Sequence, residues 1–410
     1  MRLSLEPVFR RQWASTCDAL SDGSIDPAAF QRLVAPYLAE LTPVEGRQLW
    51  AIDGSSWPRP DAVTSPERTC CRVPIPGSAG QSIIDGWEWQ WLVGIPEAAG
   101  SWVLPLSVER RSRAAGTPTQ LAITQVRQMQ EARAATGAEQ VRPLLLLDSQ
   151  YDVVQLVEAD LGVDLLCRLA RNRVFSRRPV WSGVGRKPLH GPTFKLADPT
   201  THGEPDHHLV QPDATHGTLT IDVWDHLHRP EAAHIEVALI RIQLGHYAPR
   251  AHRTGSPKAL WLVWHGAGVP PDLVCFRAWY QRRFAIEHAF RFLKQELGWT
   301  KIRPRAPQTA ERWSWLLGLA WWQLWLARGQ ITAPRLPWER PPPPGQPCSP
   351  GQVRRALAAC LRALGTPARP PKVRGMSPGR QRGVCPGRAP RHPAQKRGPP
   401  QRRKRRNTPS

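Results

Sequence analysis

The alternation of apolar and polar positions predicts a chain in which strands and helices follow one another. Apolar residues at helical spacing predict four early helices, at residues 7–19, 26–41, 119–136 and 151–159. Runs of mostly apolar residues and an alternating Trp87, Trp89, Trp91 triplet predict strands, at residues 48–53, 141–148, 164–169 and 258–264 and twice within 81–110. Strands interleaved with helices indicate an α/β fold with a mixed sheet flanked by helices.

A late helix is predicted over residues 271–299, and its polar positions are unusual. Tyr280, Arg283, Glu287 and Lys294 are spaced 3, 4 and 7 apart, which brings them within a sector of roughly 60° on one helix. An adjoining face is apolar at core-seeking spacing. One edge of this helix therefore presents an acid, two cations and a phenol, a mixture that suits metal-dependent chemistry on a phosphodiester.

Residues 171–255 depart from the α/β pattern. They are rich in Pro, Gly, His and Thr and contain two short strand-like runs, which predicts a β-rich insertion. We therefore expect an N-terminal helical region at 1–45, a main domain at 46–335 that contains the insertion, and a Pro/Arg-rich tail at 336–410 that is mostly disordered. The N-terminal region is a candidate for DNA binding, although nothing in it forms a clear helix-turn-helix.

Charge is concentrated at the C-terminal end. The formal net charge is +23, the last acidic residue is Glu339, and 18 Lys and Arg follow it. Such a tail favours polyanions, nucleic acid first and acidic membrane surfaces second. Eight cysteines without a CxxC pair, no signal-like start and no apolar run long enough for a membrane span indicate a cytoplasmic, nucleoid-associated protein.

Three acids stand where one site could use them together. Asp53 closes the first apolar run, Asp148 closes the most apolar run, and Glu287 lies on the late helix. Carboxylates are the hard oxygen ligands that Mg²⁺ prefers, and an α/β sheet presents such groups at the carboxyl ends of its strands. The three acids are therefore a candidate site for two metal ions.

Other interpretations of these acids stay open. An Asp at a strand end is often a turn residue or a helix cap, and a Glu on an Arg-rich helix often makes only solvated ion pairs. Asp152 is a rival for the second position, and Asp61 and Asp85 are rivals for the first. Gly54, next to Asp53, would let DNA or another backbone come close.

The acids and the spacing Tyr280-x2-Arg283-x3-Glu287-x6-Lys294 resemble the DDE triad and the Tyr-Arg-Glu-Lys signature of bacterial insertion-sequence transposases. The resemblance covers residues 45–330 approximately. Among these transposases, the chain resembles the group that has a β-rich insertion between the second Asp and the Glu, because 139 residues separate Asp148 from Glu287.

The resemblance implies a ribonuclease H-like core that cleaves and joins DNA at element ends with two Mg²⁺ ions, for which Mn²⁺ can substitute. It implies that Asp53, Asp148 and Glu287 are catalytic metal ligands and that Tyr280, Arg283 and Lys294 contact the DNA backbone. The implied partners are transposon-end and target DNA, bound by a homodimer, without a membrane.

Three other functions compete. A nuclease on the same core would cleave DNA without strand transfer, and a catalytically inactive, transposase-derived protein would only bind it. A zinc-dependent regulator would use the histidines of the insertion, which lack regular ligand spacing: His202, His207, His208, His216, His226 and His228.

Tryptophans give two further expectations. The helix predicted over residues 311–328 is rich in Trp, and such a stripe is more often core than a base-stacking surface. The resemblance also implies that a Trp of the insertion region can hold a flipped-out base, and Trp181, Trp224 and Trp261 are the candidates.

Overall fold

The computed structural model describes residues 13–75, 80–138, 141–248, 257–332, 336–339, 347–364 and 387–395. The expectation of disorder in the C-terminal tail falls largely on residues 365–386 and 396–410, which lie outside this range. Residues 387–395 are described and contact the core. Within the described part, no helix is long and apolar enough to cross a membrane.

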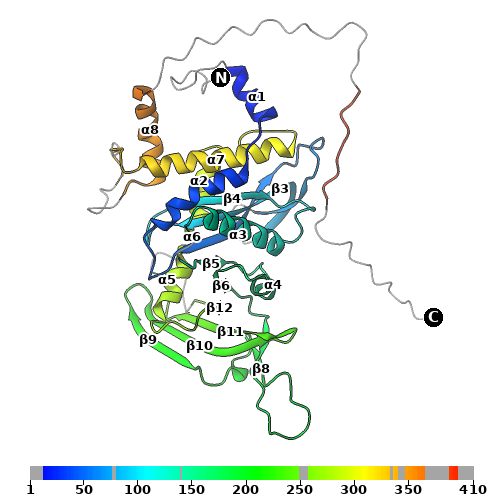
Figure 1. Cartoon of the computed structure of the whole chain (residues 1–410), viewed down its shortest axis with the longest axis vertical. Helices are drawn as coiled ribbons and strands as arrows, with labels where there is room; N and C mark the ends of the chain where they lie inside the picture. The colour runs from blue at the N-terminus through cyan, green and yellow to red at the C-terminus, as the bar shows by residue number, and fades with distance from the viewer. Residues whose placement is uncertain are drawn as a thin grey trace, which may run out of the picture.

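The centre of the molecule is a mixed sheet of the ribonuclease H type, which confirms the predicted fold class (Figure 1). Strand β1 pairs antiparallel with β3 and parallel with β5, and β5 pairs parallel with β6. The strands of this half are β1 (Leu49–Pro58), β2 (Thr69–Pro74), β3 (Gln81–Ile95), β4 (Leu104–Arg110), β5 (Leu144–Leu147) and β6 (Asp164–Arg168). The continuous apolar runs form central strands, because a strand that is covered on both faces buries all of its side chains.

Helices connect and cover these strands. The connections that bring β5 and β6 parallel to β1 contain α3 (Pro118–Ala135) and α4 (Val153–Glu158). Helix α3 begins where expected, because Thr117 and Gln120 form a capping box and Pro118 occupies the first turn. The N-terminal region contains α1 (Trp13–Asp22) and α2 (Pro27–Ala39), the latter capped by the Asp26 carboxylate.

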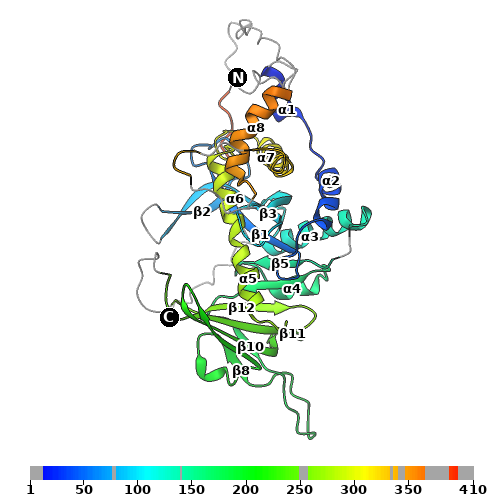
Figure 2. The ribbon, with the colours of Figure 1, turned by 90° about the vertical axis from the view of Figure 1, so that its left-hand side faces the viewer.

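The predicted insertion is β-rich and extends the same sheet. Strand β12 pairs antiparallel with β6, β11 with β12, and β10 with β11. The elements from the insertion onward are β7 (Val174–Ser176), β8 (Thr193–Lys195), η2 (Pro199–Thr201), β9 (His207–Asp213), β10 (Gly217–Arg229), β11 (Ala232–Leu244) and β12 (Leu260–His265). Figures 1 and 2 show this half below the core strands, so that the insertion continues the sheet past β6.

The late helix is two helices, which corrects the prediction of one element over residues 271–299. Helix α5 (Val274–Arg282) ends at Arg283 and α6 (Phe284–Gln295) begins beyond it. At this junction the backbone hydrogen bonds span three residues, from Arg283 to Tyr280 and from Ile286 to Arg283. A three-residue turn rotates the chain further per residue than the roughly 100° of an α-helix. The angles between side chains that were predicted for one continuous helix therefore do not hold across Arg283. Figure 2 shows α5 and α6 end to end beside the sheet.

Aromatic packing holds α6 and the last helices against the sheet. Trp91 of β3 packs edge-to-face on Trp299 at 5.2 Å and on Phe290 of α6 at 6.2 Å between ring centroids. Helix α7 (Pro307–Ala327) buries most of its tryptophans, which confirms that its stripe is core, and α8 (Pro350–Leu364) follows it.

The insertion has its own aromatic core. Trp224 and Trp261 are buried and stack at 5.6 Å, so neither presents a face to an unpaired base. Trp181 is 48% exposed.

Candidate active site

Asp53 lies inside a strand, which corrects the expectation that it ends one. Strand β1 continues to Pro58 because its antiparallel register with β3 runs unbroken from Leu49↔Ile95 to Pro58↔Gly86. The Gly-Ser-Ser sequence after Asp53 resembles a turn, but pairing with the Trp-rich β3 keeps it extended. Asp53 accepts a hydrogen bond from the Gly54 N–H at 2.7 Å.

Asp148 follows β5 directly, as predicted, and the sheet brings it level with Asp53. The parallel register pairs Ala51 of β1 with Leu146 of β5, and each aspartate lies two residues further along its own strand. Neighbouring strands are about 4.8 Å apart. Asp53 and Asp148, the two aspartates predicted from the sequence, therefore lie side by side on the sheet.

The rival acids have other partners. Asp152 caps α4, where it accepts from the Val154 N–H at 3.0 Å. Asp61 is exposed and pairs with Arg303 at 3.6 Å. Asp85 is 43% exposed and lies 3.5 Å from Arg68. None of these contacts reaches the Asp53–Asp148 edge.

Arg283 joins Glu287 to Asp53. Its Nη1 donates to Asp53 Oδ2 at 2.8 Å and its Nη2 donates to Glu287 Oε1 at 3.0 Å. The Arg283 side chain is only 10% exposed, Asp53 is 15% exposed and Glu287 is 39% exposed. The helix junction thus places a cation between two acids that are 234 residues apart in sequence.

The three acids influence one another electrostatically. Burial raises the pKa of Asp53, the Arg283 charge opposes the rise, and the charge of Asp148 adds to it. Burial likewise raises the pKa of Glu287, again opposed by Arg283 and increased by Asp53 and Asp148. The ionised carboxylates repel one another, so a cation among them stabilises the site, whether it is a guanidinium or a metal ion.

The other signature residues differ in their surroundings. Tyr280 is buried, which raises its pKa to about 12, and its hydroxyl has no hydrogen-bond partner within the described residues. The Tyr280 hydroxyl is therefore a protonated donor that is buried and unpartnered within the described residues. Lys294 lies over the Trp299 ring, with Nζ 5.8 Å from its centroid, and burial lowers the Lys294 pKa.

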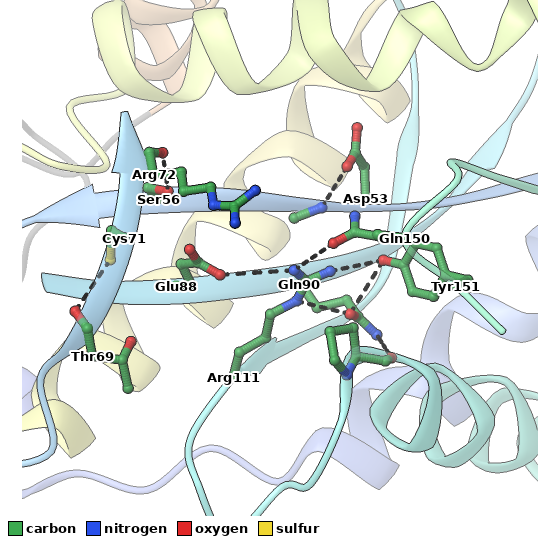
Figure 3. Close-up of polar contacts among 12 residues, drawn as sticks. Asp53, Ser56, Thr69, Cys71, Arg72, Glu88, Gln90, Arg111, Gln150 and Tyr151 are labelled. Atoms are coloured by element: carbon green, nitrogen blue, oxygen red, sulfur yellow. Dashed lines mark hydrogen bonds and ion pairs between the residues drawn. The ribbon is translucent and has the colours of Figure 1, made fainter. Parts of the chain in front are cut away.

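Sequence reasoning missed Arg111, whose guanidinium joins β3 to the loop after Asp148 (Figure 3). Its guanidinium donates to Gln90 of β3 at 2.9 Å, and to Gln150 at 3.0 Å and Tyr151 at 2.8 Å in the loop after Asp148. It also lies against Gly54, where an added Cβ would be 2.7 Å from Arg111 Nη1. The space beside Gly54 is thus filled by Arg111 and not by DNA. A glycine inside a strand was the available signal.

The donor set of the site fits a hard divalent ion, since it consists of carboxylates and already holds one cation between Asp53 and Glu287. Across the described residues, no three His, Cys, Asp or Glu side chains are gathered closely enough to hold a metal ion together. The insertion histidines instead make separate contacts, such as His208 with Asp222 at 2.6 Å and His226 with Glu236 at 2.9 Å.

Comparison with known proteins adds one finding. The sequence model of a family described as DDE superfamily endonuclease matches residues 2–229, slightly more than half of the chain. The matched segment contains Asp53 and Asp148 and ends before Glu287. No curated protein matches the chain.

Proposed function

The chain belongs to the DDE superfamily endonucleases, and from this premise we propose that it is a transposase that cleaves DNA at insertion-sequence ends and joins them to a target. The observation that carries the proposal is the Arg283 bridge between Asp53 and Glu287, with Asp148 following the strand next to that of Asp53. Asp53 and Asp148 lie level on neighbouring parallel strands, and Arg283 connects Glu287 to Asp53. The Tyr-Arg-Glu-Lys spacing favours a transposase over a general nuclease.

In this proposal Asp53, Asp148 and Glu287 hold the divalent ions that DDE endonucleases generally use, here two Mg²⁺ with Mn²⁺ able to substitute. Such ions activate a water or a 3′-hydroxyl and stabilise the leaving oxygen. The protein supplies rigid positions for the acids: β1 fixes Asp53, and the Arg111 network fixes the loop after Asp148.

The signature residues then bind the substrate backbone. Arg283 keeps Asp53 and Glu287 oriented, and its remaining N–H donors suit phosphate oxygens. The Tyr280 hydroxyl is buried and lacks a partner in the described structure, so donation to a phosphate oxygen requires the site to open around it. Lys294 adds positive charge further along α6. We propose further that the protein acts on transposon-end and target DNA as a homodimer at the bacterial nucleoid.

The test is a cleavage and strand-transfer assay on DNA that carries the inverted repeats expected to bracket the gene. The wild-type protein should give Mg²⁺-dependent cleavage and a joined product, and Glu287→Gln should give neither while still binding DNA. Glu296→Gln is the matched control, because Glu296 lies just beyond α6 and pairs with Arg354.

Other outcomes identify the competitors. Cleavage without joining would indicate a nuclease, and DNA binding with no cleavage at any divalent ion would indicate an inactive derivative. Stoichiometric bound zinc that is insensitive to changes at Asp53 and Glu287 would indicate the regulator.

A further inference from the structure

A cavity lies beside the loop that follows Asp148. Its volume is about 240 Å³, and its walls come from this loop, the start of α4, the end of β6 and the strands of the insertion. Helix α4 and β11 contact one another here, at the boundary between the core strands and the insertion (Figure 1). Ser149 lines the cavity and follows Asp148 directly, so the cavity borders the acid-bearing end of β5.

Three arginines line this cavity: Arg168, Arg173 and Arg229. Within the described residues, neither the Arg168 nor the Arg173 side chain has a hydrogen-bond or ion-pair partner. Arg229 pairs with Glu231 at 2.5 Å through Nη2, while its Nε is buried and has no partner among the same residues. The cavity is therefore lined by three guanidiniums that all have donors to spare.

The charge of the cavity is positive, because the acid among its lining residues is already engaged. Asp152 accepts from the Val154 N–H at 3.0 Å through Oδ1 and from Gln155 Nε2 at 3.1 Å through Oδ2. Much of the remaining lining is apolar and buried, including Phe175 and Val263. An apolar lining with a few convergent charged groups is typical of a ligand site, and the excess positive charge selects an anion.

Arg168 connects the cavity to the proposed metal site. Leu147 of β5 pairs with Cys167 of β6, so the next residues, Asp148 and Arg168, have backbones about 4.8 Å apart. Burial raises the pKa of Tyr280, the charge of Asp148 adds to the rise, and the charge of Arg168 opposes it. A group that leaves the metal site thus has an unpartnered guanidinium next to it.

Cleavage of DNA at such a metal site produces an anion that suits the cavity. Water attacks the scissile phosphorus, the bond to the 3′ oxygen breaks, a proton of the water passes to that oxygen, and the phosphate stays on the 5′ carbon. The new phosphate monoester has a charge of about −1.5 to −2 at pH 7, whereas the phosphodiester had a single negative charge. A strand end can also enter a cavity lined by buried side chains, because the chain does not have to leave it again.

We infer that the cavity binds the 5′-phosphate of the DNA strand that cleavage releases, with Arg168 and Arg173 as ligands and Arg229 Nε as a further donor. Guanidinium forks match the geometry of phosphate oxygens. The cavity keeps the cut strand on the protein after the bond is broken. This inference rests on the proposed function, because DNA cleavage at the neighbouring acids is the source of the phosphate.

The test compares DNA ends in the absence of metal. Full-length protein in EDTA is titrated with three labelled blunt duplexes of about 20 base pairs, whose ends have a 5′-phosphate, a 3′-phosphate or only hydroxyl groups. The wild-type protein should bind the 5′-phosphorylated duplex roughly tenfold more tightly than the other two, because hydrogen bonds to a charged group contribute on this scale.

Arg173→Gln removes one cation of the cavity, and Arg171→Gln is its matched control. Arg171 is exposed, lies two residues away and is not among the residues that line the cavity, so both variants lose the same charge from the same segment. Arg173→Gln should abolish most of the preference for the 5′-phosphate, and Arg171→Gln should keep it. Arg168→Gln should also reduce the preference, and its exposed position makes it a second variant that does not disturb packing.

Three results would each overturn the inference: equal binding of the three duplexes by wild type, equal preference for a 3′-phosphate, or a full preference retained by both Arg173→Gln and Arg168→Gln. Because the titration requires no cleavage, its failure is distinguishable from failure of the proposed function. Equal binding by a protein that cleaves DNA removes the cavity assignment alone. A 5′-phosphate preference in a protein that forms no joined product removes the transposase assignment and leaves a site for DNA ends.

Discussion

Replacing Arg283 by methionine is expected to destabilise the protein most where Asp53 and Glu287 are ionised. The variant keeps an apolar stem but leaves two carboxylates without the cation that joins them at 2.8 and 3.0 Å. Burial already raises the pKa values of both acids, and Arg283 limits the rise. Its removal should therefore raise both pKa values further.

The magnitude follows from burial. Removing one partner of a buried ion pair costs about 3–5 kcal/mol. Asp53 is 15% exposed while Glu287 is 39% exposed, so most of the penalty falls on Asp53 and the lower end, about 3 kcal/mol, applies. With an unfolding entropy of about 2 cal/mol/K per residue over the described chain, this corresponds to a melting temperature about 4 °C lower.

The pH dependence has a definite sign. The pKa of each acid lies above its ordinary value of 3.8 or 4.5 in the folded state, so the folded state holds protons that the unfolded state releases. The destabilisation by Arg283→Met should be smallest below pH 3.8, where both acids are protonated in the folded and the unfolded state, and should grow as pH rises through the folded-state pKa values. Mg²⁺ should stabilise the variant more than wild type, because the ion supplies the missing positive charge.

Thermal melting by circular dichroism, in EDTA and in Mg²⁺ at pH 4 and pH 8, measures these effects. Arg312→Met is the control, since Arg312 donates to the Leu20 backbone carbonyl at 2.7 Å and its loss should depend little on pH or Mg²⁺. An Arg283→Met penalty that is equal at both pH values would refute the electrostatic role. A penalty insensitive to Mg²⁺ would refute the idea that the acids share a cation site.

Three further variants test the support of the site and the surrounding fold. Arg111→Met should lower the cleavage rate tenfold or more with DNA affinity unchanged, because it frees the loop after Asp148, and single-turnover kinetics measures this. Gly54→Ala should destabilise by about 1–3 kcal/mol, since its Cβ would meet Arg111 at 2.7 Å, and should cost less when Arg111 is Met; urea denaturation compares the two backgrounds. Burial, aided by Glu311, raises the pKa of Glu109 to about 7, so wild type should lose stability as pH rises through 7. Glu109→Gln should therefore be about 2 kcal/mol more stable than wild type at pH 8 and about equal below pH 4.5, as judged by melting curves.

Much of the fold could be predicted because buried strands have a local pattern of apolar residues that identifies them. The run of four leucines at β5 and the alternating tryptophans of β3 allow little except strands with buried side chains. Asp148 was correctly placed at a strand end, because the apolar run stops immediately before it. The β-rich character of the insertion was also readable from its composition and short strand-like runs.

What failed depended on contacts between distant segments. Nothing local to Gly54 shows that β3 keeps β1 extended past Asp53, because that pairing lies more than 30 residues away in sequence. Arg283 was expected to contact the DNA backbone and Arg111 was not singled out, yet each is buried against partners from distant segments of the chain. The tail segment docks through backbone hydrogen bonds, which a Pro/Arg-rich composition does not reveal.

Iron-mediated cleavage of the polypeptide shows whether Asp53, Asp148 and Glu287 form one metal site. Fe²⁺ in place of Mg²⁺, with ascorbate and peroxide, generates radicals that cut the backbone near the bound ion, and mass spectrometry locates the cuts. A shared metal site should give cuts near all three acids, suppressed by excess Mg²⁺ and lost in Asp53→Asn. Cuts confined to the histidine-bearing strands of the insertion, or unchanged by Asp53→Asn, would contradict it.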